Sequence, residues 1–192
     1  MTPRHAAEFT SVDVEMAWVE SHEDVMQMEE EWLRHVLVAV RAGHGERIAR
    51  ELGTEVVVPS LPFPRLTMRD AHELLRSEGH RIAETTKPGD IDPAGERLLA
   101  QWALDTHGSE FLFLTEYPAS LRPFYHMRAE HDAALTKSFD LLWKGVEITT
   151  GAQREHRHGV LSRQADSRSG RNRDSTRLTA VSPDQLCLVA FR

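Results

Sequence analysis

The sequence predicts an α+β fold in which an antiparallel sheet is flanked by helices. Segments with the pattern of strands occur at residues 8–19, 111–114 and 137–143, and segments with helical spacing lie between the first two of these. Strands at both ends of a region, with helices inserted between them, are typical of α+β domains rather than of alternating βαβ units. We therefore expect an antiparallel sheet with an inserted helical segment.

The bulk composition is that of a globular domain without a membrane span. The chain has 192 residues, of which 40% are hydrophobic, and this is enough for one core. No apolar run approaches the roughly 18 residues that cross a bilayer, and no signal-peptide core follows the first five residues. The single Cys187 excludes an internal disulfide and a four-cysteine zinc site. We expect a cytoplasmic protein with no membrane partner.

Charge is spread unevenly along the chain. The formal net charge of −7 argues against a protein that binds nucleic acid over its whole surface, because Lys and Arg make the phosphate contacts. Acidic residues are concentrated between Glu8 and Glu55, whereas seven arginines lie between Arg154 and Arg177. This basic part either contacts phosphate or is a solvated tail.

The first strand and the first helix follow each other directly. In residues 8–19, apolar residues alternate with Asp13 and Glu15, which gives the predicted strand one acidic face. Ser21 stands three residues before an aspartate in the pattern of a capping box, so a helix is expected to begin there. Helical spacing continues to Gly43, and a continuation beyond this glycine is left open.

Two further helices are expected after a proline-rich connector. Thr67 is the predicted cap of a short helix that stops at Gly79. Asp92-Pro93 repeats the start signal, with the aspartate as cap and the proline at the first helical position, for a helix to about Gly108.

The second half of the predicted sheet consists of short strands. Residues 111–114 form a compact apolar run, and residues 123–127 are interpreted as the return partner of this strand. Residues 137–143 predict a half-buried strand, which is followed by a glycine turn at Gly145. The next strand is therefore expected to form an antiparallel pair with residues 137–143.

Regular patterns end near Arg157. Residues 162–175 have neither a helical nor an alternating apolar period, so we expect them to be poorly ordered. Residues 186–191 are apolar but isolated. We therefore divide the chain into a folded domain at residues 1–161 and a divergent, poorly ordered tail at residues 162–192.

The segment 146–157 carries an acid, a hydroxyl and a guanidinium where a strand is expected to pass into a helix. Glu147 and Thr150 both offer oxygen to a hard cation, as in Mg²⁺ sites that substrate phosphates complete. Arg154, expected in the first turn of the helix, matches a carboxylate bidentately, and a helix N-terminus attracts anions. The alternative is a structural ion pair between a buried Glu147 and a neighbouring arginine.

Several motifs of this sequence occur together in one known family. They are, in order along the chain, Arg4-His5, Glu8–Met16, Leu114–Pro118, Pro123–Tyr125, Ser138–Leu141 and Glu147–Arg157. Through them, residues 4–157 resemble the catalytic core of aspartyl-tRNA synthetase of the archaeal and eukaryotic type, a class II aminoacyl-tRNA synthetase. The sequence of residues 151–156 favours the aspartate enzyme over its asparagine relative, in which a further Gly-Ser precedes Gln-Arg.

The resemblance implies an aspartate–tRNA ligase that uses ATP and Mg²⁺. By that resemblance Arg4, His5 and Glu147 contact ATP. Glu147 and Thr150 hold Mg²⁺, and Thr150 and Arg154 bind aspartate. The acceptor of the aspartyl group would be tRNA(Asp), with discrimination against tRNA(Asn) left open, and the family is homodimeric.

The sequence also departs from the family pattern, and the departures concern the ATP site. It begins within motif 2, so the first arginine of that motif, the motif 1 dimer interface and the anticodon-binding barrel have no match, and neither has motif 3 with its arginine. Each missing charged contact to phosphate would cost on the order of a few kcal/mol of transition-state stabilisation. We expect a fragment with impaired activity alone. The alternative is a non-catalytic paralogue or truncated gene product that acts as a binding or regulatory module.

The remaining histidines, acidic residues, methionines and tryptophans are assigned to the core, to the surface or to the support of the site. The histidine pairs lack the spacing of a helical zinc motif, so all eleven histidines are interpreted as surface or core residues. Asp13 and Glu15 either support the site or face solvent, and we favour support. Core positions are expected for Met16, Trp18, Met28 and Trp32. A solvated helix face is expected for Glu20, Glu23, Glu29, Glu30 and Glu31.

Overall fold

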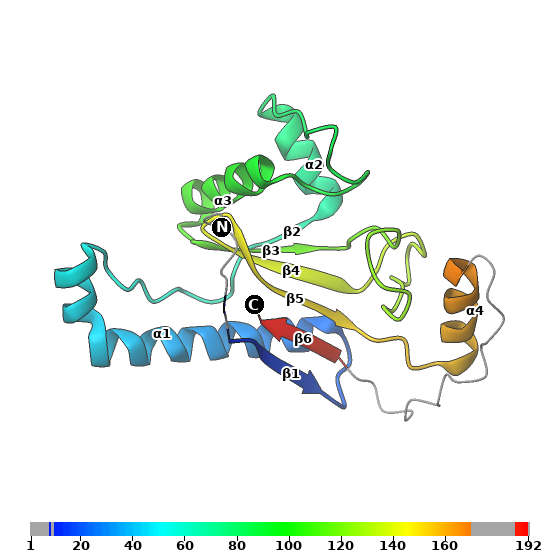
Figure 1. Ribbon diagram of the computed structural model, residues 1–192, viewed down its shortest axis with the longest axis horizontal. Coiled ribbons are helices and arrows are strands. Elements are labelled where there is room, and N and C mark those ends of the chain that lie inside the picture. Colours follow the sequence, from blue (N-terminus) through cyan, green and yellow to red (C-terminus); the bar gives the residue numbers. More distant parts are fainter. Residues whose placement is uncertain (1–7, 9, 170–186, 192) are drawn as a thin grey trace.

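The computed structural model describes residues 8, 10–169 and 187–191, and within them one sheet is covered by helices on both faces (Figure 1). The described strands are β1 (Val12–Met16), β2 (Arg65–Thr67), β3 (Phe111–Thr115), β4 (Ser138–Trp143), β5 (Val146–Gln153) and β6 (Cys187–Phe191). The described helices are α1 (His22–Leu52), α2 (Met68–Ser77), α3 (Pro93–His107) and α4 (His158–Ser169). Among these residues, none of the helices has the length and apolar character to cross a membrane.

The sheet has six strands in the order β1-β6-β5-β4-β3-β2. All neighbours are antiparallel except β2 and β3, which are parallel. Helices α2 and α3 lie between β2 and β3 in sequence, and a parallel pair needs such a long crossover. The predicted α+β class is therefore confirmed, with a mixed sheet in place of a purely antiparallel one.

The two faces of the sheet have separate cores because successive side chains of a strand point in opposite directions. Phe111 and Phe113 of β3 pack with Val25 and Met26 of α1. The intervening Leu112 packs with α2 and α3. Helix α1 therefore covers one face, and α2 and α3 cover the other.

The partner predicted for β3 was wrong. Its antiparallel neighbour is β4, whereas residues 123–127 contribute only the isolated bridge between His126 and Arg154. Pro123 has no backbone N–H to donate to a ladder, which disfavours a regular strand there. Strand β4 is also more buried than predicted, since only Trp143 is exposed among its six residues.

Strand β1 is shorter than the predicted strand at residues 8–19, and this changes the position of one tryptophan. Trp18 has a φ of 64° and is 82% exposed, because the alternation that would turn it toward the core ends with the strand at Met16. Trp32 is also exposed, so the core positions predicted for both tryptophans were wrong. Met16 and Met28 pack against the core as expected.

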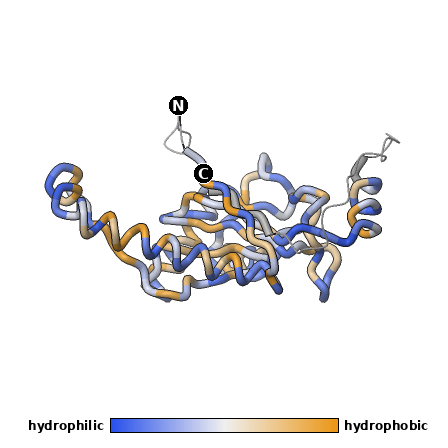
Figure 2. The backbone as a smooth tube through the Cα atoms, turned by 90° about the horizontal axis from the view of Figure 1, so that it is seen from below, coloured by the Kyte–Doolittle hydropathy of each residue, from blue (hydrophilic) through white to orange (hydrophobic). Residues whose placement is uncertain are grey.

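Helix α1 begins at the predicted cap and continues past Gly43. The Ser21 hydroxyl accepts from the backbone of Glu23, and the Asp24 carboxylate accepts from the backbone of Ser21, which forms the capping box. The helix ends at Gly53 in the left-handed conformation, with a φ of 65°. Its C-terminal part extends beyond the sheet and turns (Figure 1), and polar and apolar residues alternate along it (Figure 2).

Helices α2 and α3 have the predicted caps. Thr67 accepts from the backbone of Asp70, and Asp92 accepts from the backbone of Gly95. Helix α3 ends at Gly108, which is left-handed as a C-terminal glycine commonly is.

The C-terminal part of the chain differs from the expectation as far as it is described. Residues 162–169, expected to be poorly ordered, form most of α4, where the Gln164 amide donates to the Phe124 carbonyl at 2.7 Å. Residues 187–191, expected to be isolated, form β6 between β1 and β5. The rest of the predicted tail lies outside the described residues, and the domain boundary at residue 161 stays a prediction.

Candidate active site

The site is built on the hairpin of β4 and β5. Lys144 and Gly145 join the two strands and have φ values of 52° and 76°, as in the two-residue turns that favour glycine. A side chain on Gly145 would also lie 2.9 Å from the Cα of Arg97 in α3. The glycine turn predicted from the sequence is therefore present, and α3 packs directly over it.

A register shift in this hairpin determines which residues share a face. Leu142 pairs with Glu147 and Leu141 pairs with Thr149, so Ile148 is an extra residue in β5. Residues three apart on a regular strand point to opposite faces. Because of the extra residue, Glu147 and Thr150 lie on the same face of the sheet, and Asp140 lies on that face opposite Thr150.

The same face continues across β6 to β1. Thr150 pairs with Ala190, which pairs with Asp13, and Ala152 is related to Glu15 through β6 in the same way. The acidic face predicted for the first strand is therefore the face that carries Glu147 and Thr150. Helices α2 and α3 pack on this face over β3 and β4, whereas α1 packs on the opposite one.

Arg154 lies close to these residues but not in a helix. It follows β5 directly and forms a bridge with His126, and α4 begins only at His158. The prediction that a helix N-terminus adds positive charge at Arg154 was therefore wrong. The chain continues to pair there, and Arg154 Nη2 lies 2.9 Å from Glu15 Oε1. Arg154 Nε is buried and makes no hydrogen bond within the described part of the chain.

Arg122, which sequence reasoning missed, lies at the centre of the site. It comes from the connection between β3 and β4, and its Nη1 donates to Thr150 Oγ1 at 3.0 Å. Its Nη2 forms an ion pair with Asp140 Oδ2 at 2.7 Å, and the guanidinium lies 3.7 Å from the centre of the Tyr117 ring. A sequence signal existed, since Asp140 is a charged residue between Phe139 and Leu141 and needs a partner when buried.

Burial and charge act in opposite directions on this arginine. Burial disfavours its charge, but the adjacent Asp140 carboxylate outweighs burial and raises the pKa of Arg122 above its ordinary value. Burial, together with the charge of Asp140, raises the pKa of Tyr117 well above its ordinary value. At neutral pH the site therefore contains a fixed cation and a neutral phenol, and Glu147 adds negative charge that acts on both.

The donors of this face fit a hard cation only if a ligand supplies further oxygens. Within the described residues there is no group of three His, Cys, Asp or Glu that could hold a metal. The Thr150 hydroxyl already accepts from Arg122, which weakens it as a metal ligand. Glu147 and Thr150 match the pattern of Mg²⁺ sites that are completed by phosphates and water. Arg122 Nε and Asp140 Oδ1 are buried and make no hydrogen bond among the described residues, so polar capacity remains for a ligand.

On the opposite face, two glutamates of α1 are buried, so the expectation that they face solvent was wrong. Glu29 is fully buried, and its Oε1 accepts from Thr149 Oγ1 at 2.6 Å. Burial raises the pKa of Glu29 to about 8. Glu30 accepts from the backbone of Phe63 at 2.9 Å and pairs with Arg65 at 3.0 Å.

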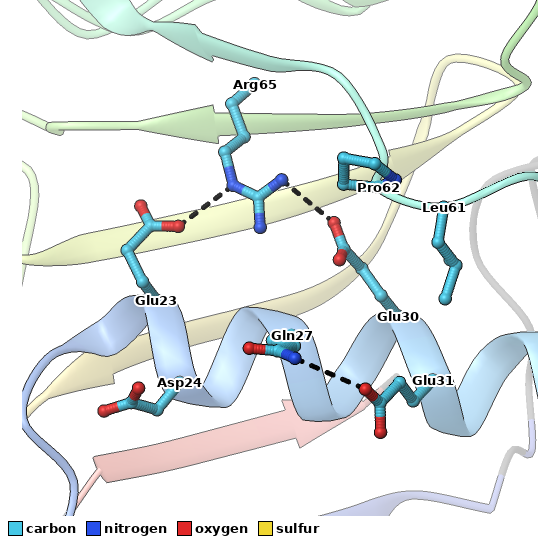
Figure 3. A pocket seen from close by; sticks show the side chains of 8 residues that line it. All are labelled: Glu23, Asp24, Gln27, Glu30, Glu31, Leu61, Pro62 and Arg65. Atoms are coloured by element: carbon cyan, nitrogen blue, oxygen red, sulfur yellow. Dashed lines mark hydrogen bonds and ion pairs between the residues drawn. The ribbon is translucent and has the colours of Figure 1, made fainter.

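A hollow also lies on this opposite face. It has a volume of about 380 Å³ and lies between α1 and the segment before β2 (Figure 3). Its one cation, Arg65, is already paired with Glu23 and Glu30, as the dashed lines in Figure 3 show. Because α1 and the sheet core separate it from Glu147 and Thr150, this hollow is not part of the candidate active site.

Five of the residues singled out from the sequence are thus found together on one face, namely Asp13, Glu15, Glu147, Thr150 and Arg154. The ATP-contacting pair predicted from the resemblance, Arg4 and His5, lies outside the described residues.

Residues 1–178 match the family of tRNA synthetases class II (D, K and N), and the chain belongs to this family. The resemblance inferred from the sequence motifs is therefore confirmed.

Several curated relatives are aspartate–tRNA ligases. The chain is 41% identical over 163 residues to an aspartate–tRNA(Asp) ligase of Pyrococcus abyssi, which covers 85% of this chain and 36% of that protein. It is 39% identical over 161 residues to an aspartate–tRNA(Asp/Asn) ligase of Aeropyrum pernix, covering 83% and 36%. The chain thus spans about a third of the length of these curated relatives.

Solved structures agree on the fold. Aspartyl-tRNA synthetase from Entamoeba histolytica superposes with a TM-score of 0.82 at 26% identity, over 100% of this chain and 40% of that one. Asparaginyl-tRNA synthetase from the same organism, in complex with asparaginyl-adenylate, gives a TM-score of 0.82 at 25% identity, over 100% and 44%.

Proposed function

We propose that this chain forms part of the catalytic domain of an aspartate–tRNA ligase, which activates aspartate with ATP and transfers the aspartyl group to tRNA(Asp). The observation that carries the proposal is the register of β5, which sets Glu147 and Thr150 on one face beside Arg154. Aspartate is favoured as the amino acid because the relatives at 41% and 39% identity are aspartate ligases. A binding or regulatory module without turnover is not favoured, for the same reason.

Arg154 is proposed to bind the side-chain carboxylate of aspartate. Its guanidinium is oriented by Glu15, while the buried Nε has no partner among the described residues. A guanidinium with a free edge binds a carboxylate through two parallel hydrogen bonds, and the planar fork sets the direction of the ligand. Thr150, held by Arg122, would contact the same ligand through its hydroxyl.

Glu147 and Thr150 are proposed to hold Mg²⁺ together with the phosphates of ATP. When bound, the cation would neutralise phosphate charge that builds up as the acyl phosphate bond forms and pyrophosphate leaves. Arg122 holds the Thr150 hydroxyl in place and forms an ion pair with Asp140 next to it. The hairpin thus supplies oriented groups that need not reorganise during the reaction.

Other parts of the proposed function rest on family membership. Arg4 and His5 are proposed to contact ATP, and tRNA(Asp) is proposed as the acceptor of the aspartyl group. A homodimer and a cytoplasmic location are proposed on the same basis.

The test is aspartate binding, measured by isothermal titration calorimetry with the purified chain. Arg154→Ala is expected to lower aspartate affinity at least about 10-fold, because the bidentate contact is lost. Arg154→Lys keeps the charge but not the fork and should give an intermediate value. Arg81→Ala, at an exposed arginine in the connection between α2 and α3, is the matched control and should bind aspartate like the wild type.

Asparagine provides the comparison ligand, since it has the same size without the second charge. Weaker binding of asparagine than of aspartate is expected. If Arg154→Ala and the wild type bound aspartate equally, the proposed role of Arg154 would be wrong.

A further inference from the structure

The placement of Glu147 and Thr150 on one face depends on a single extra residue in β5. If Ile148 were taken into a regular ladder, Glu147 and Thr150 would be three positions apart on a regular strand and would point to opposite faces. Hydrogen bonds of the ladder alone do not prevent this, because the backbone of a slipped strand pairs equally well. Some side-chain contact must therefore select the observed register.

Two such contacts lie on the face of β5 that is turned toward α1. Thr149, between Ile148 and Thr150, donates to Glu29 across 120 positions of sequence. Gly151 lies against the ring of Phe139, which leaves no room for a side chain at that position. Both contacts depend on which residue of β5 lies at these positions, and the hydroxyl and carboxyl pair is the one that is directional.

The surroundings of Glu29 show that this pair is not required for packing. Val25 and Met26 of the same helix, together with Phe139 and Leu141 of β4, form an apolar core on this face. A carboxyl group in such a core is costly compared with an apolar side chain of the same size. A single buried polar contact retained among apolar residues is a known means of fixing register.

We infer that Glu29 is a positioning residue for the candidate active site, and that it acts through Thr149 to fix the register of β5. This inference rests on the proposed function for the roles of Glu147 and Thr150. The contact lies on the side of the sheet opposite the substrate face, so Glu29 touches no reacting group. Its effect on the site is transmitted by one strand, since Thr149 and Thr150 are adjacent.

Paired variants separate the effect of losing the Thr149–Glu29 hydrogen bond from the effect of changing side-chain volume. Thr149→Val removes the hydroxyl at nearly constant size, and Thr149→Ser restores it. Glu29→Leu removes the acceptor, and Glu29→Gln retains it. We expect Thr149→Val and Glu29→Leu to lower aspartate affinity about 10-fold, and Thr149→Ser and Glu29→Gln to stay within about 2-fold of the wild type.

Register is measured independently of ligand binding. In the wild type, NMR contacts between the backbones of Asp140 and Thr150 report the observed pairing. Thr149→Val is expected to weaken these contacts while its thermal unfolding remains cooperative. Should Glu29→Leu fail to fold, the Thr149 pair alone carries the test.

The outcomes distinguish the two proposals. Unchanged Asp140–Thr150 contacts and unchanged affinity in Thr149→Val would overturn the inference about Glu29 and leave the proposed function standing. Loss of the contacts in Thr149→Val, in a chain whose wild type binds no aspartate, would support the positioning role and overturn the proposed function. Loss of affinity in Thr149→Ser as well as Thr149→Val would also contradict the inference, since the hydroxyl would then be irrelevant.

Discussion

The two faces of the β4–β5 hairpin contain buried polar groups of different character. On the face toward α1, the carboxyl group of Glu29 meets the hydroxyl of Thr149 inside an apolar core. On the other face, Asp140 and Arg122 form an ion pair that also contacts Thr150. Burial without a cation raises the pKa of Glu29 to about 8, whereas Arg122 keeps its charge next to Asp140. One strand pair thus separates a neutral, architectural contact from a charged face that is able to bind ligands.

The largest change in the free energy of unfolding is expected when the buried ion pair of Arg122 and Asp140 is broken. Asp140→Ala leaves the guanidinium of Arg122, only 12% exposed, without its counter-charge. A loss of about 3–5 kcal/mol in the free energy of unfolding is expected, measured by urea denaturation. The double variant Asp140→Leu with Arg122→Met serves as control and should lose less, because no charge remains buried. A change below about 1 kcal/mol in the single variant would show that the pair is effectively solvated.

The contact between Glu29 and Thr149 should make the free energy of unfolding depend on pH. The pKa of Glu29 rises from 4.5 to about 8 on folding, so between these values the folded chain holds a proton that the unfolded chain has lost. Stability from this group is therefore complete below the lower value and decreases as pH rises, by at most about 1.4 kcal/mol per pH unit.

Glu29→Gln isolates this effect because all other titrating groups are shared. Unfolding free energies of both proteins, measured at intervals from pH 5.5 to 7.5, should diverge by roughly 2–3 kcal/mol in total. The wild type is expected to lose stability relative to the variant. Parallel curves would mean that Glu29 is ionised in the folded chain.

Local signals in the sequence predicted local structure well. The caps Ser21, Thr67 and Asp92 each accept a hydrogen bond from a backbone N–H group within three residues. A short sequence pattern is therefore sufficient to predict where each helix begins. The glycine turn at Gly145 is specified in the same way, by two residues that need positive φ. The fold class followed because strands and helices are separated along the chain.

Contacts between distant segments account for the errors. Glu29 is buried because α1 packs on a strand 120 positions away, and a run of glutamates on a helix does not reveal which of them faces the sheet. The register shift at Ile148 depends on β4, and the position of Arg122 depends on the path of the β3–β4 connection. Arg154 continues the pairing with His126 instead of starting a helix. Glu147 and Thr150 were identified, but the reason why they share a face was not.

A smaller effect is expected from the close approach of Gly151 to Phe139. A Cβ at this position would overlap the ring, so Gly151→Ala should destabilise the fold by about 1–3 kcal/mol in urea denaturation. Gly43→Ala is the matched control, because nothing lies within 4 Å of its added Cβ in the interior of α1. That variant should gain about 0.5–1 kcal/mol from helix propensity. Equal effects of the two substitutions would mean that the ring moves aside without cost.

The smallest effect is expected at the second ion pair of the charged face. Arg154 and Glu15 are 32% and 48% exposed, so solvent screens their attraction. Glu15→Gln should reduce the free energy of unfolding by only about 0.2–1 kcal/mol, and less again in 1 M salt. Comparing the loss in Glu15→Gln with the loss in Asp140→Ala tests whether the two arginines have different roles. Arg122 would be fixed by burial, whereas Arg154 would be accessible to a ligand. If Glu15→Gln cost as much as Asp140→Ala, Arg154 would be as tightly held as Arg122, and the proposed difference between the two arginines would be wrong.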